Sequence, residues 1–460
     1  MGRLAVAAAV AAWAVPVAAL VNSVVPDPYM DEIFHVPQAQ RYCRGEFLVW
    51  DPMITTPPGL YYISLAYLAS LFPGAWAIKV AEAFDPLCTT ALLRSTNVMM
   101  AMVCGVLVYD LLLCIKPGIG KTKATAYAIL VALYPVHWFF TFLYYTDVAS
   151  LAAVLAMYLF CLKKRFWVSA MFGAISILFR QTNIIWMLFF AANGAITYVQ
   201  DLPVSDYVSH KNSRLTDKSS TEVLDRDNTA SAPGLRRRRT NSSISQSRVV
   251  SGSTNLHISA KEAHVVSPHF AQFLYFGLVS AAALLPLHFT PRRVSELFRW
   301  CAKNKTSSSL AMLVALGLSF VAVHFFSIAH PYLLADNRHY TFYIWRKVIQ
   351  AHWMMKYILI PIYVYSWFSV INILGKSQTR VWVLSFVFAV ALVLVPAPLV
   401  EFRYYTIPLV IVVLNSPVIG NCRLLALGSA YTAADLCTLV MFLFKPFHWE
   451  HETGTQRFIW

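Results

Sequence analysis

Long runs of apolar residues alternate with short polar segments along most of the chain. An apolar run of roughly 18 residues can cross a bilayer as a helix. Such runs lie at about 4–25, 90–115, 124–143, 146–162, 166–199, 268–290, 309–329, 353–374, 380–400 and 425–444, with a shorter one near 404–416. The run at 166–199 is long enough for two short spans separated by the polar cluster RQTN at 180–183. We therefore expect an all-α polytopic membrane protein with about twelve transmembrane helices.

Two longer segments interrupt the apolar runs. Residues 26–89 are rich in proline, aspartate and aromatic residues, and the stretch 59–72 within them predicts an interfacial or re-entrant helix. Residues 200–267 are polar and serine-rich and contain four consecutive arginines, so they have too little apolar surface to fold and predict a disordered linker. The predicted organisation is a first transmembrane anchor at 1–25, the loop 26–89, a transmembrane bundle at 90–199, the linker 200–267 and a second bundle at 268–460.

The distribution of basic residues orients the predicted spans, because short cytosolic loops carry an excess of lysine and arginine. The loops 116–123 and 163–165 are the most basic, which places them in the cytosol and 26–89 on the lumenal face. The linker is then cytosolic, and the basic loop 291–308 is also cytosolic only if one further span precedes Lys261. The sequence contains no such span. If such a span were present, the polar loops 330–347 and 400–405 would lie on the lumenal face, as does the loop 26–89.

Composition and charge exclude several other classes of protein. Hydrophobic residues make up 58% of the 460 residues and charged residues only 13%, against roughly a quarter in soluble proteins. A cytosolic globular enzyme, a disordered protein and a secreted disulfide scaffold are therefore excluded. The net charge of +15 comes from basic residues in short loops, which indicates topology rather than nucleic-acid binding. The eight cysteines form no CxxC pair, and we expect neither a metal knuckle nor a disulfide framework.

The densest polar cluster of the chain lies between residues 26 and 62. Asp31 and Glu32 are adjacent, and His35 follows Asp31 by four residues, which on a helix places Asp31 and His35 on one face. Pro37 is unfavourable inside a helix, so we expect a short turn that ends before it. A positioned carboxylate can take the proton of a sugar hydroxyl, and a phosphate leaving group needs no general acid. One carboxylate therefore suffices, and the spacing does not decide between Asp31 and Glu32.

Arginines at the ends of three apolar runs suit a lipid phosphate. Arg180, Arg338 and Arg403 are these residues, and a guanidinium binds phosphate oxygens in a bidentate manner. Alternatively, each arginine snorkels to the membrane surface or acts as a topology signal. Neighbouring aromatic residues such as Tyr340 are also typical of a membrane interface. The sequence shows no ligand-spaced acidic pair and no glycine-rich phosphate loop, so we expect neither a metal nor a cofactor.

Five strings along the chain carry a family resemblance: YMDEIFHVPQAQRYC, WDPMITTPPGLYY, LFRQTNIIW, HPYLLADNRHYTFYIWRK and EFRYYTIP. They resemble the endoplasmic-reticulum alpha-1,2-glucosyltransferases of lipid-linked oligosaccharide assembly. These enzymes add the third and last glucose to the dolichyl-diphosphate oligosaccharide and use dolichyl-phosphate glucose as donor.

The resemblance implies a GT-C type fold, a lumenal active site and inversion from a β-linked donor to an α-1,2 product. It places Asp31 at the position of the catalytic carboxylate, with Glu32 as the neighbouring candidate, and turns the loop 330–347 towards the donor phosphate. The expected partners are the dolichyl-phosphate glucose donor, the dolichyl-diphosphate oligosaccharide acceptor and membrane lipid, with no nucleic acid. The substrate-binding residues expected within these motifs are His35, Gln38, Trp50, Asp51, Arg180, Asp336, Arg338, His339, Tyr340 and Arg403.

The chain departs from the family between residues 200 and 267. Members of the family carry a further hydrophobic span before the segment that reads KEAHVVSPHF here, and this chain has none. Two other functions are compatible with parts of the sequence. A transporter would use ionisable residues in broken spans, for which Arg180 and Asp147 are the candidates, although the polar residues concentrate at one surface. A GT-C mannosyltransferase would act by the same mechanism on dolichyl-phosphate mannose.

Overall fold

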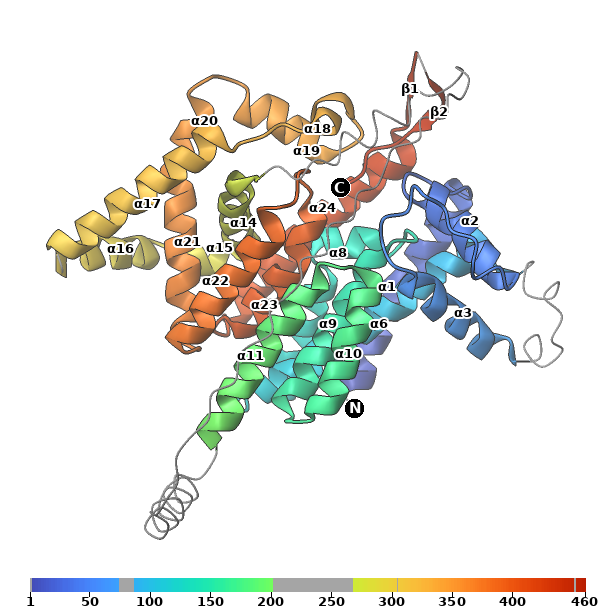
Figure 1. Cartoon of the computed structure of the whole chain (residues 1–460), viewed down its shortest axis with the longest axis horizontal. Helices are drawn as coiled ribbons and strands as arrows, with labels where there is room; N and C mark the ends of the chain where they lie inside the picture. Colours follow the sequence, from blue (N-terminus) through green and yellow to red (C-terminus); the bar gives the residue numbers. More distant parts are fainter. Residues whose placement is uncertain (1, 74–86, 202–267, 304, 451) are drawn as a thin grey trace, which may run out of the picture. The chain divides into compact units, whose positions relative to one another are not determined.

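The computed structural model describes residues 2–73, 87–201, 268–303, 305–450 and 452–460. Residues Met1–Gly194 and Val266–Trp460 form one compact unit, and the site described below lies entirely within it. The second unit is Ala195–Val265, of which the structure describes only the end of one helix. The described residues are mostly α-helical, as expected, with one two-stranded hairpin near the end of the chain (Figure 1).

The first half of the described chain contains nine helices. They are α1 (Gly2–Val24), α2 (Glu32–Cys43), α3 (Gly59–Leu71), α6 (Thr90–Ile115), α7 (Lys121–Ala132), α8 (Pro135–Phe140), α9 (Thr146–Leu162), α10 (Phe166–Phe179) and α11 (Asn183–Asp201). The expected hairpin at 166–199 is confirmed as α10 and α11. Arg180 adopts an extended conformation (φ −149°, ψ 127°) and so ends α10.

The second half contains shorter and more irregular elements. They are α14 (Phe270–Ala283), α15 (Leu285–His288), α16 (Pro291–Lys303), α17 (Lys305–Phe325), α18 (Pro331–Ala335), α19 (Tyr340–Ile344), the π-helix η2 (Trp345–Ile349), α20 (Met355–Ile358), α21 (Ile360–Leu374), α22 (Arg380–Leu394), the 3₁₀-helix η3 (Phe402–Tyr405), α23 (Thr406–Asn415), α24 (Asn421–Phe444), β1 (Phe447–Trp449) and β2 (Glu452–Gln456). Strands β1 and β2 pair antiparallel.

Five of the described helical segments are long and apolar enough to cross a membrane: Gly2–Val24, Thr90–Ile115, Lys305–Phe325, Met355–Leu374 and Asn421–Phe444. Six further apolar helices of 10–17 residues accompany them. The chain is therefore an all-α, multi-pass membrane protein. The expected total of about twelve spans stays a prediction.

Close helix packing brings the loop 26–89 onto the first bundle. Helix α6 packs against α1 and α9, and α9 packs against α10 (Figure 1). Helix α3 approaches α10 so closely that a Cβ atom on Gly59 would lie 2.5 Å from the carbonyl oxygen of Leu178. Glycine is therefore required at position 59, and this contact holds the start of α3 beside the α10–α11 turn.

The expectation that the turn after Asp31 ends before Pro37 is wrong. Helix α2 continues through Pro37 to Cys43, and the proline ring lies on its exposed side. On the opposite side, Val36, Ala39 and Tyr42 are buried. Burial of this apolar face outweighs the backbone hydrogen bond that proline removes.

The segment 330–347, expected to be a polar loop, and the tail of the chain, residues 445–460, both contain regular secondary structure. Residues 330–347 form α18, α19 and the start of η2, joined by the stretch 336–339. The tail forms the β1–β2 hairpin and then pairs with this stretch, because Ile459 accepts a hydrogen bond from the Tyr340 amide (3.1 Å) and donates one to the Arg338 carbonyl (2.9 Å). The tail thereby becomes part of the same surface as residues 336–341.

Helices α11 and α14 meet α22 at its two opposite ends. Phe189 of α11 lies against Trp382 near the start of α22, with ring centroids 5.3 Å apart. Further along α11, the Asn193 amide contacts the Ser385 hydroxyl at 3.3 Å. The amide of His269, immediately before α14, instead donates to the carbonyl of Val395, just beyond the other end of α22 (2.8 Å). The chain therefore leaves the compact unit at one end of the bundle and re-enters at the other. Residues 202–267 lie outside the described residues. They include the position of the expected further span and all of the predicted linker 200–267 except its first two residues, which belong to the end of α11.

Candidate active site

Two cavities meet at one end of the bundle. Their shared wall is formed by Asp31, Phe34, Tyr145 and Arg403. The charged cavity, of about 420 Å³, is lined beyond the shared wall by Met30, Ile33, Phe140, Tyr332, Leu333, Asp336, Arg338, His339, Thr341, Leu399, Val400, Glu401, Ile459 and Trp460. The hydroxyl cavity, of about 330 Å³, is lined by His35, Met53, Ile54, Thr55, Thr56, Thr146, Arg180, Gln181, Thr182 and Tyr404.

Asp31 stands between the two cavities. It immediately precedes α2, and its amide donates to the Tyr145 hydroxyl (3.2 Å). One carboxylate oxygen accepts from Arg403 Nη1 at 3.1 Å, and 44% of the side chain is exposed. Burial would raise the pKa of the Asp31 carboxyl, but the charge of Arg403 and the hydrogen bond from it lower the pKa below its ordinary value. Asp31 is therefore an ionised and accessible carboxylate.

Glu32 points away from both cavities. Its carboxylate forms a bidentate pair with the Arg94 guanidinium (2.6 and 2.8 Å), and both side chains are completely buried. The same carboxylate accepts from the backbone amides of Tyr29 (3.0 Å) and Tyr144 (2.5 Å). Because four hydrogen bonds occupy its oxygens, Glu32 is positioned to hold the loop and not to contact a substrate. No motif in the sequence had indicated Arg94. A lone arginine near the start of an apolar run is nevertheless a signal for a buried ion pair.

Arg403 connects three carboxylates. Besides Asp31, it pairs with Glu401 through Nε (2.8 Å) and Nη2 (2.6 Å), and its Nη1 lies 3.9 Å from Asp147. The guanidinium stacks over the rings of Phe140 and Tyr145 at 5.4 and 5.3 Å. These contacts fix one arginine at the junction of the two cavities.

Arg180, which lines the hydroxyl cavity, forms an ion pair with Asp147. Their charged groups lie 3.0 Å apart, and Arg180 Nε also donates to the Thr146 hydroxyl (3.2 Å). The guanidinium stacks over the ring of Tyr404 at 5.6 Å. This pair lies beside Arg403, so it belongs to the same polar surface as Asp31.

Arg338 is held rigidly in the charged cavity. It makes a bidentate pair with Asp336 (two contacts of 2.8 Å), donates to Gln456 of β2 (3.0 Å) and stacks over Trp449 at 4.7 Å. Burial would raise the pKa of the Asp336 carboxyl, but the hydrogen bonds from Arg338 and its charge lower the pKa below its ordinary value.

The two residues after Arg338 contact the tail. His339 lines the charged cavity, and its Nδ1 lies 3.3 Å from the backbone carbonyl oxygen of Trp460. Tyr340 lies outside that lining, with its ring 5.1 Å from the ring of Trp460. The tail residues Ile459 and Trp460 complete this wall, and no motif in the sequence had indicated them.

His35 reaches the hydroxyl cavity from α2. Its Nδ1 is 2.6 Å from the hydroxyl of Tyr61, and the predicted placement of Asp31 and His35 on one side of the turn agrees with the shared lining of this cavity. Burial lowers the pKa of His35 below its ordinary value, although the charge of Asp31 opposes this effect. His35 is therefore a neutral hydrogen-bonding group near neutral pH.

Three other predicted substrate-binding residues shape the loop beside the hydroxyl cavity. Gln38 donates to the carbonyl of Val49 (2.7 Å) and accepts from the amide of Asp51 (3.0 Å). The indole of Trp50 donates to the carbonyl of Ile54 (3.2 Å). The structure places Gln38, Trp50 and Asp51 outside the lining of both cavities, where they hold the segment that carries Thr55 and Thr56.

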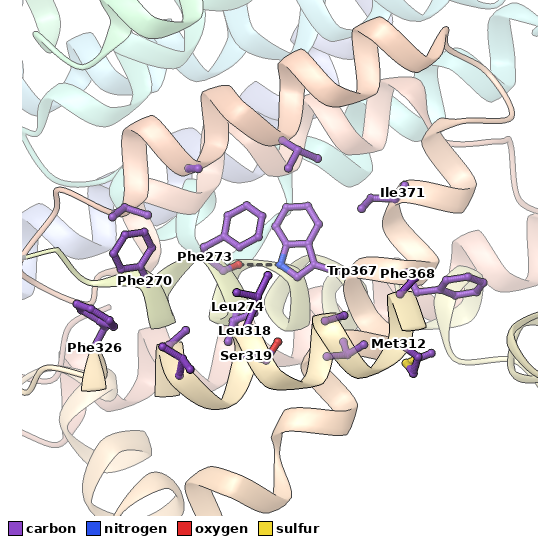
Figure 2. Close-up of a pocket in the computed structure, with 18 of the residues that line it drawn as sticks. Phe270, Phe273, Leu274, Met312, Leu318, Ser319, Phe326, Trp367, Phe368 and Ile371 are labelled. Carbon is purple, nitrogen blue, oxygen red and sulfur yellow. Dashed lines mark hydrogen bonds between the residues drawn. The ribbon is translucent and has the colours of Figure 1, made fainter. Parts of the chain in front are cut away.

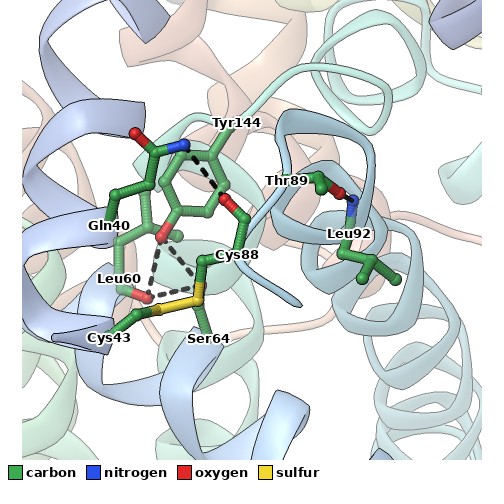
Figure 3. The surroundings of a disulfide bond; sticks show 8 residues. All are labelled: Gln40, Cys43, Leu60, Ser64, Cys88, Thr89, Leu92 and Tyr144. Carbon is green, nitrogen blue, oxygen red and sulfur yellow. Dashed lines mark hydrogen bonds between the residues drawn. A yellow bond between two sulfur atoms is a disulfide. The ribbon is translucent and has the colours of Figure 1, made fainter. Parts of the chain in front are cut away.

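A disulfide joins Cys43 at the end of α2 to Cys88 before α6, so the expectation of no disulfide is wrong (Figure 3). The two cysteines are 45 residues apart in the sequence, and α3 lies between them. No spacing motif could have predicted this pair. The side-chain amide of Gln40 donates to the Cys88 carbonyl (3.1 Å), which strengthens the same connection.

Within the described parts of the chain, no three His, Cys, Asp or Glu side chains are arranged to hold a metal ion. The charge at the junction instead comes from Asp31, Asp147 and Glu401 and from Arg180 and Arg403. Such a set can place a carboxylate and several guanidinium donors around a sugar phosphate.

The chain is similar over most of its length to the proteins of one family. The sequence model of the DIE2/ALG10 family matches residues 25–414. An Arabidopsis thaliana protein named Dol-P-Glc:Glc(2)Man(9)GlcNAc(2)-PP-Dol alpha-1,2-glucosyltransferase is 47% identical over 509 aligned residues, with all of both chains covered. This alignment is longer than the 460 residues of the chain, so it includes segments that the chain lacks.

More distant relatives carry the same name. Those from Homo sapiens and Yarrowia lipolytica are 34% and 31% identical, over 94% and 95% of this chain and 93% and 94% of theirs. No solved structure matches the chain.

Proposed function

The chain belongs to the DIE2/ALG10 family, and from this premise we propose that it transfers glucose from dolichyl-phosphate glucose to the diglucosylated dolichyl-diphosphate oligosaccharide, with Asp31 as the general base. The product is the terminal α-1,2-linked glucose of the oligosaccharide. The chain is a glycosyltransferase that uses a dolichol-linked sugar, and its fold is of the GT-C type in this proposal.

The exposed carboxylate of Asp31 is the observation that carries the proposal. In the transfer, the acceptor 2-hydroxyl oxygen bonds to C1 of the donor glucose, and the bond from C1 to the phosphate oxygen breaks. Asp31 takes the hydroxyl proton, and dolichyl phosphate leaves with the bonding electrons. Arginines beside Asp31 stabilise the negative charge on the leaving phosphate. Attack opposite the leaving group inverts the anomeric centre.

The disulfide supports a lumenal position for this end of the protein. Disulfides persist in oxidising compartments such as the lumen of the endoplasmic reticulum and are rare in the cytosol. Cys43 ends α2, the helix that Asp31 immediately precedes, and the segment between the two cysteines carries Thr55 and Thr56 of the hydroxyl cavity, so the same compartment would hold the site. We propose a multi-pass protein of the endoplasmic-reticulum membrane whose Asp31 end faces the lumen.

A transfer assay tests the proposed function. Microsomes that contain the chain are given labelled dolichyl-phosphate glucose and the diglucosylated acceptor, and the product is identified by its linkage. Incorporation of glucose in an α-1,2 linkage is expected. Transfer from dolichyl-phosphate mannose instead would identify a mannosyltransferase, and no transfer from either donor would contradict the proposal.

Arg338 and Arg403 are expected to bind phosphate or diphosphate groups of the substrates. Replacing either by alanine should weaken substrate binding or turnover by about 1.5–3 kcal/mol, because a charge-assisted hydrogen bond is lost. Lysine should rescue each variant only partly, since it lacks the planar fork of a guanidinium. KM and kcat for the donor measure the effect. Unchanged values in Arg338→Ala would remove that residue from the site.

Transfer is expected to need no divalent metal. Arg180, Arg338 and Arg403 line the two cavities that share Asp31 and can carry the charge of a lipid monophosphate. Activity should therefore persist after treatment with EDTA. Complete loss of activity in EDTA that magnesium or manganese restores would show that a metal takes part.

One further transmembrane span before Lys261 is expected to be needed for full function. The chain leaves the compact unit near Asn193 and re-enters at His269 on the opposite end of the bundle, which requires an odd number of crossings. The chain as it stands is expected to fail to complement loss of the enzyme. A form with an apolar span of about 20 residues inserted before Lys261 should succeed. A glycosylation tag in the linker that is modified, in an unaltered chain that is active, would contradict this prediction.

A further inference from the structure

We propose that α16 lies in the plane of the membrane surface on the side opposite Asp31, where its basic face binds the headgroups of anionic phospholipids. The partner is the lipid of the membrane leaflet that is remote from the two cavities. Neither the position of this helix in the bundle nor its charge depends on the proposed function.

Helix α16 has an apolar face and a basic face. Its sequence is PRRVSELFRWCAK, and successive residues are about 100° apart around a helix. Val294 and Phe298, four residues apart, therefore share one face. Arg292, Arg299 and Lys303, at spacings of seven and four, share another face on the other side of the helix. A loop that only marks topology needs no such separation, which is typical of a helix that lies at a membrane surface.

The described part of the chain covers neither face of this helix. No residue of α16 is buried. Val294 and Phe298 have 40% and 68% of their surface exposed, and the three residues of the basic face are exposed as well. Because the burial of apolar surface is favourable, contact of the apolar face with acyl chains would stabilise the helix at the membrane surface.

Contacts place α16 at the end of the bundle opposite Asp31. Helix α23 follows η3, which lies at the two cavities, and leads away from them to Asn415. The backbone carbonyl of Asn415 accepts a hydrogen bond from the Ser377 hydroxyl (2.5 Å). The neighbouring Lys376 Nζ lies 3.5 Å from the carboxylate of Glu296 in α16. With the Asp31 end in the lumen, α16 therefore faces the cytosol.

An apolar groove indicates the depth of α16 in the membrane. The groove, of about 860 Å³, lies between α14, α17, α21 and α22, and Figure 2 shows Met312 and Phe368 near one end of it. Trp300 of α16 also lines the groove, and its ring lies 5.6 Å from that of Phe368. Apart from Ser319, every side chain of the lining is apolar. Tryptophan is enriched where the apolar layer of a membrane meets water, so Trp300 places α16 at this boundary.

The basic face carries charge that the neighbouring residues do not neutralise. Glu296 is the only acidic residue between positions 268 and 330. The basic residues of the same segment are Arg292, Arg293, Arg299, Lys303 and Lys305. Glu296 pairs most closely with Arg293 (2.7 Å), whereas Arg299 and Lys303 form no ion pair within the described residues. An anionic phospholipid supplies the missing negative charge, and guanidinium and ammonium groups bind its phosphate oxygens.

Lipid binding to the purified full chain tests the charge of this face. The protein in a neutral detergent is titrated with labelled phosphatidylserine or phosphatidylcholine. The triple variant Arg292→Gln/Arg299→Gln/Lys303→Gln is expected to bind phosphatidylserine about tenfold or more weakly than the parent, since each basic residue near a membrane surface contributes about fivefold. Its affinity for phosphatidylcholine and its midpoint of thermal unfolding should be those of the parent, which shows that the variant is folded. High salt should abolish the preference of the parent for phosphatidylserine.

The matched control is Lys163→Gln/Arg165→Gln/Arg423→Gln. It also removes two arginines and one lysine, and all three side chains are exposed. They lie beside the end of α9 and in the first turn of α24, away from the cavities and outside α16. The control should bind phosphatidylserine as the parent does. Equal losses in the two triple variants would show only a general attraction to the basic end of the protein and would overturn the proposal.

Cysteine labelling in a bilayer tests the orientation of the helix. In a protein whose six free cysteines are alanine, Phe298→Cys and Lys303→Cys are made singly and placed in phospholipid nanodiscs. Phe298→Cys should react with a membrane-impermeant maleimide about tenfold or more slowly than Lys303→Cys, because the lipid covers the apolar face. Equal rates would show that water surrounds the helix, which leaves the face free for a cytosolic protein and contradicts the proposal. Slow labelling of Phe298→Cys combined with unchanged phosphatidylserine binding in the α16 triple variant would overturn the assignment of the basic face.

Discussion

Replacing Asp31 by asparagine is expected to lower the turnover of glucose transfer by about 10² or more, because the amide cannot accept the proton of the acceptor hydroxyl. Asparagine keeps the shape of the side chain, so the contacts of Arg403 with Glu401 should remain. The measurement is kcat for transfer from dolichyl-phosphate glucose by the purified protein, in the form that carries the inserted span and in the chain as it stands.

Asp27→Asn is the matched control for this variant. Asp27 is an exposed aspartate in the same loop, and it lies outside the lining of both cavities. The control should have the kcat of the parent protein. Near-normal turnover in Asp31→Asn, together with a folded but inactive Glu32→Gln, would move the role of base to Glu32.

Breaking the Glu32–Arg94 pair is expected to damage the protein in a different way. Both side chains are fully buried, so removing the charge of one leaves the other buried and uncompensated. Glu32→Gln or Arg94→Met should lower the free energy of unfolding by about 3–5 kcal/mol. The fall in the midpoint of thermal unfolding in detergent, and the yield of folded protein, measure this effect.

The Arg44–Glu46 pair supplies a matched control at the surface. Its charged groups lie 3.0 Å apart, but both side chains are substantially exposed. Glu46→Gln should therefore change stability by no more than about 1 kcal/mol. A Glu32→Gln protein as stable as Glu46→Gln would show that the buried pair does not hold the loop.

The pattern of apolar residues predicted where most of the described helices lie, although the runs 124–143 and 268–290 each form two helices, α7 with α8 and α14 with α15. The hairpin of α10 and α11 follows from two apolar runs with a polar turn at Arg180, and the structure has both helices. Helix α2 was more difficult, because the packing of Val36 and Tyr42 on other elements decides that the helix continues past Pro37. The local conformational preference of proline alone favoured a shorter turn that ends before Pro37.

The site was predictable as far as its residues carry a motif. The motifs indicated Asp31, Arg180, Arg338 and Arg403, and the structure brings all four to the two adjoining cavities. The roles of Arg94 and Cys88 depend on contacts between distant segments, which no spacing along the chain encodes. The structure also separates Asp31 from Glu32, because adjacent residues at the start of a helix point in different directions.

Other predicted residues do not line either cavity but hold the residues that do. Gln38 and Asp51 hydrogen-bond within the loop that carries Thr55 and Thr56. A motif string cannot distinguish a residue that contacts substrate from one that holds its neighbour. That distinction depends on side-chain direction, which follows from the folded loop.

The pairing of the tail with residues 336–341 has a consequence for biosynthesis. Ribosomes make Asp31 early and Ile459 late, yet both line the charged cavity, and Gln456 helps to hold Arg338. A nascent chain that already contains the carboxylate and all three arginines therefore still lacks one wall of this cavity. Glucose transfer should begin only after translation has passed residue 459, and products of premature termination should accumulate as inactive membrane proteins.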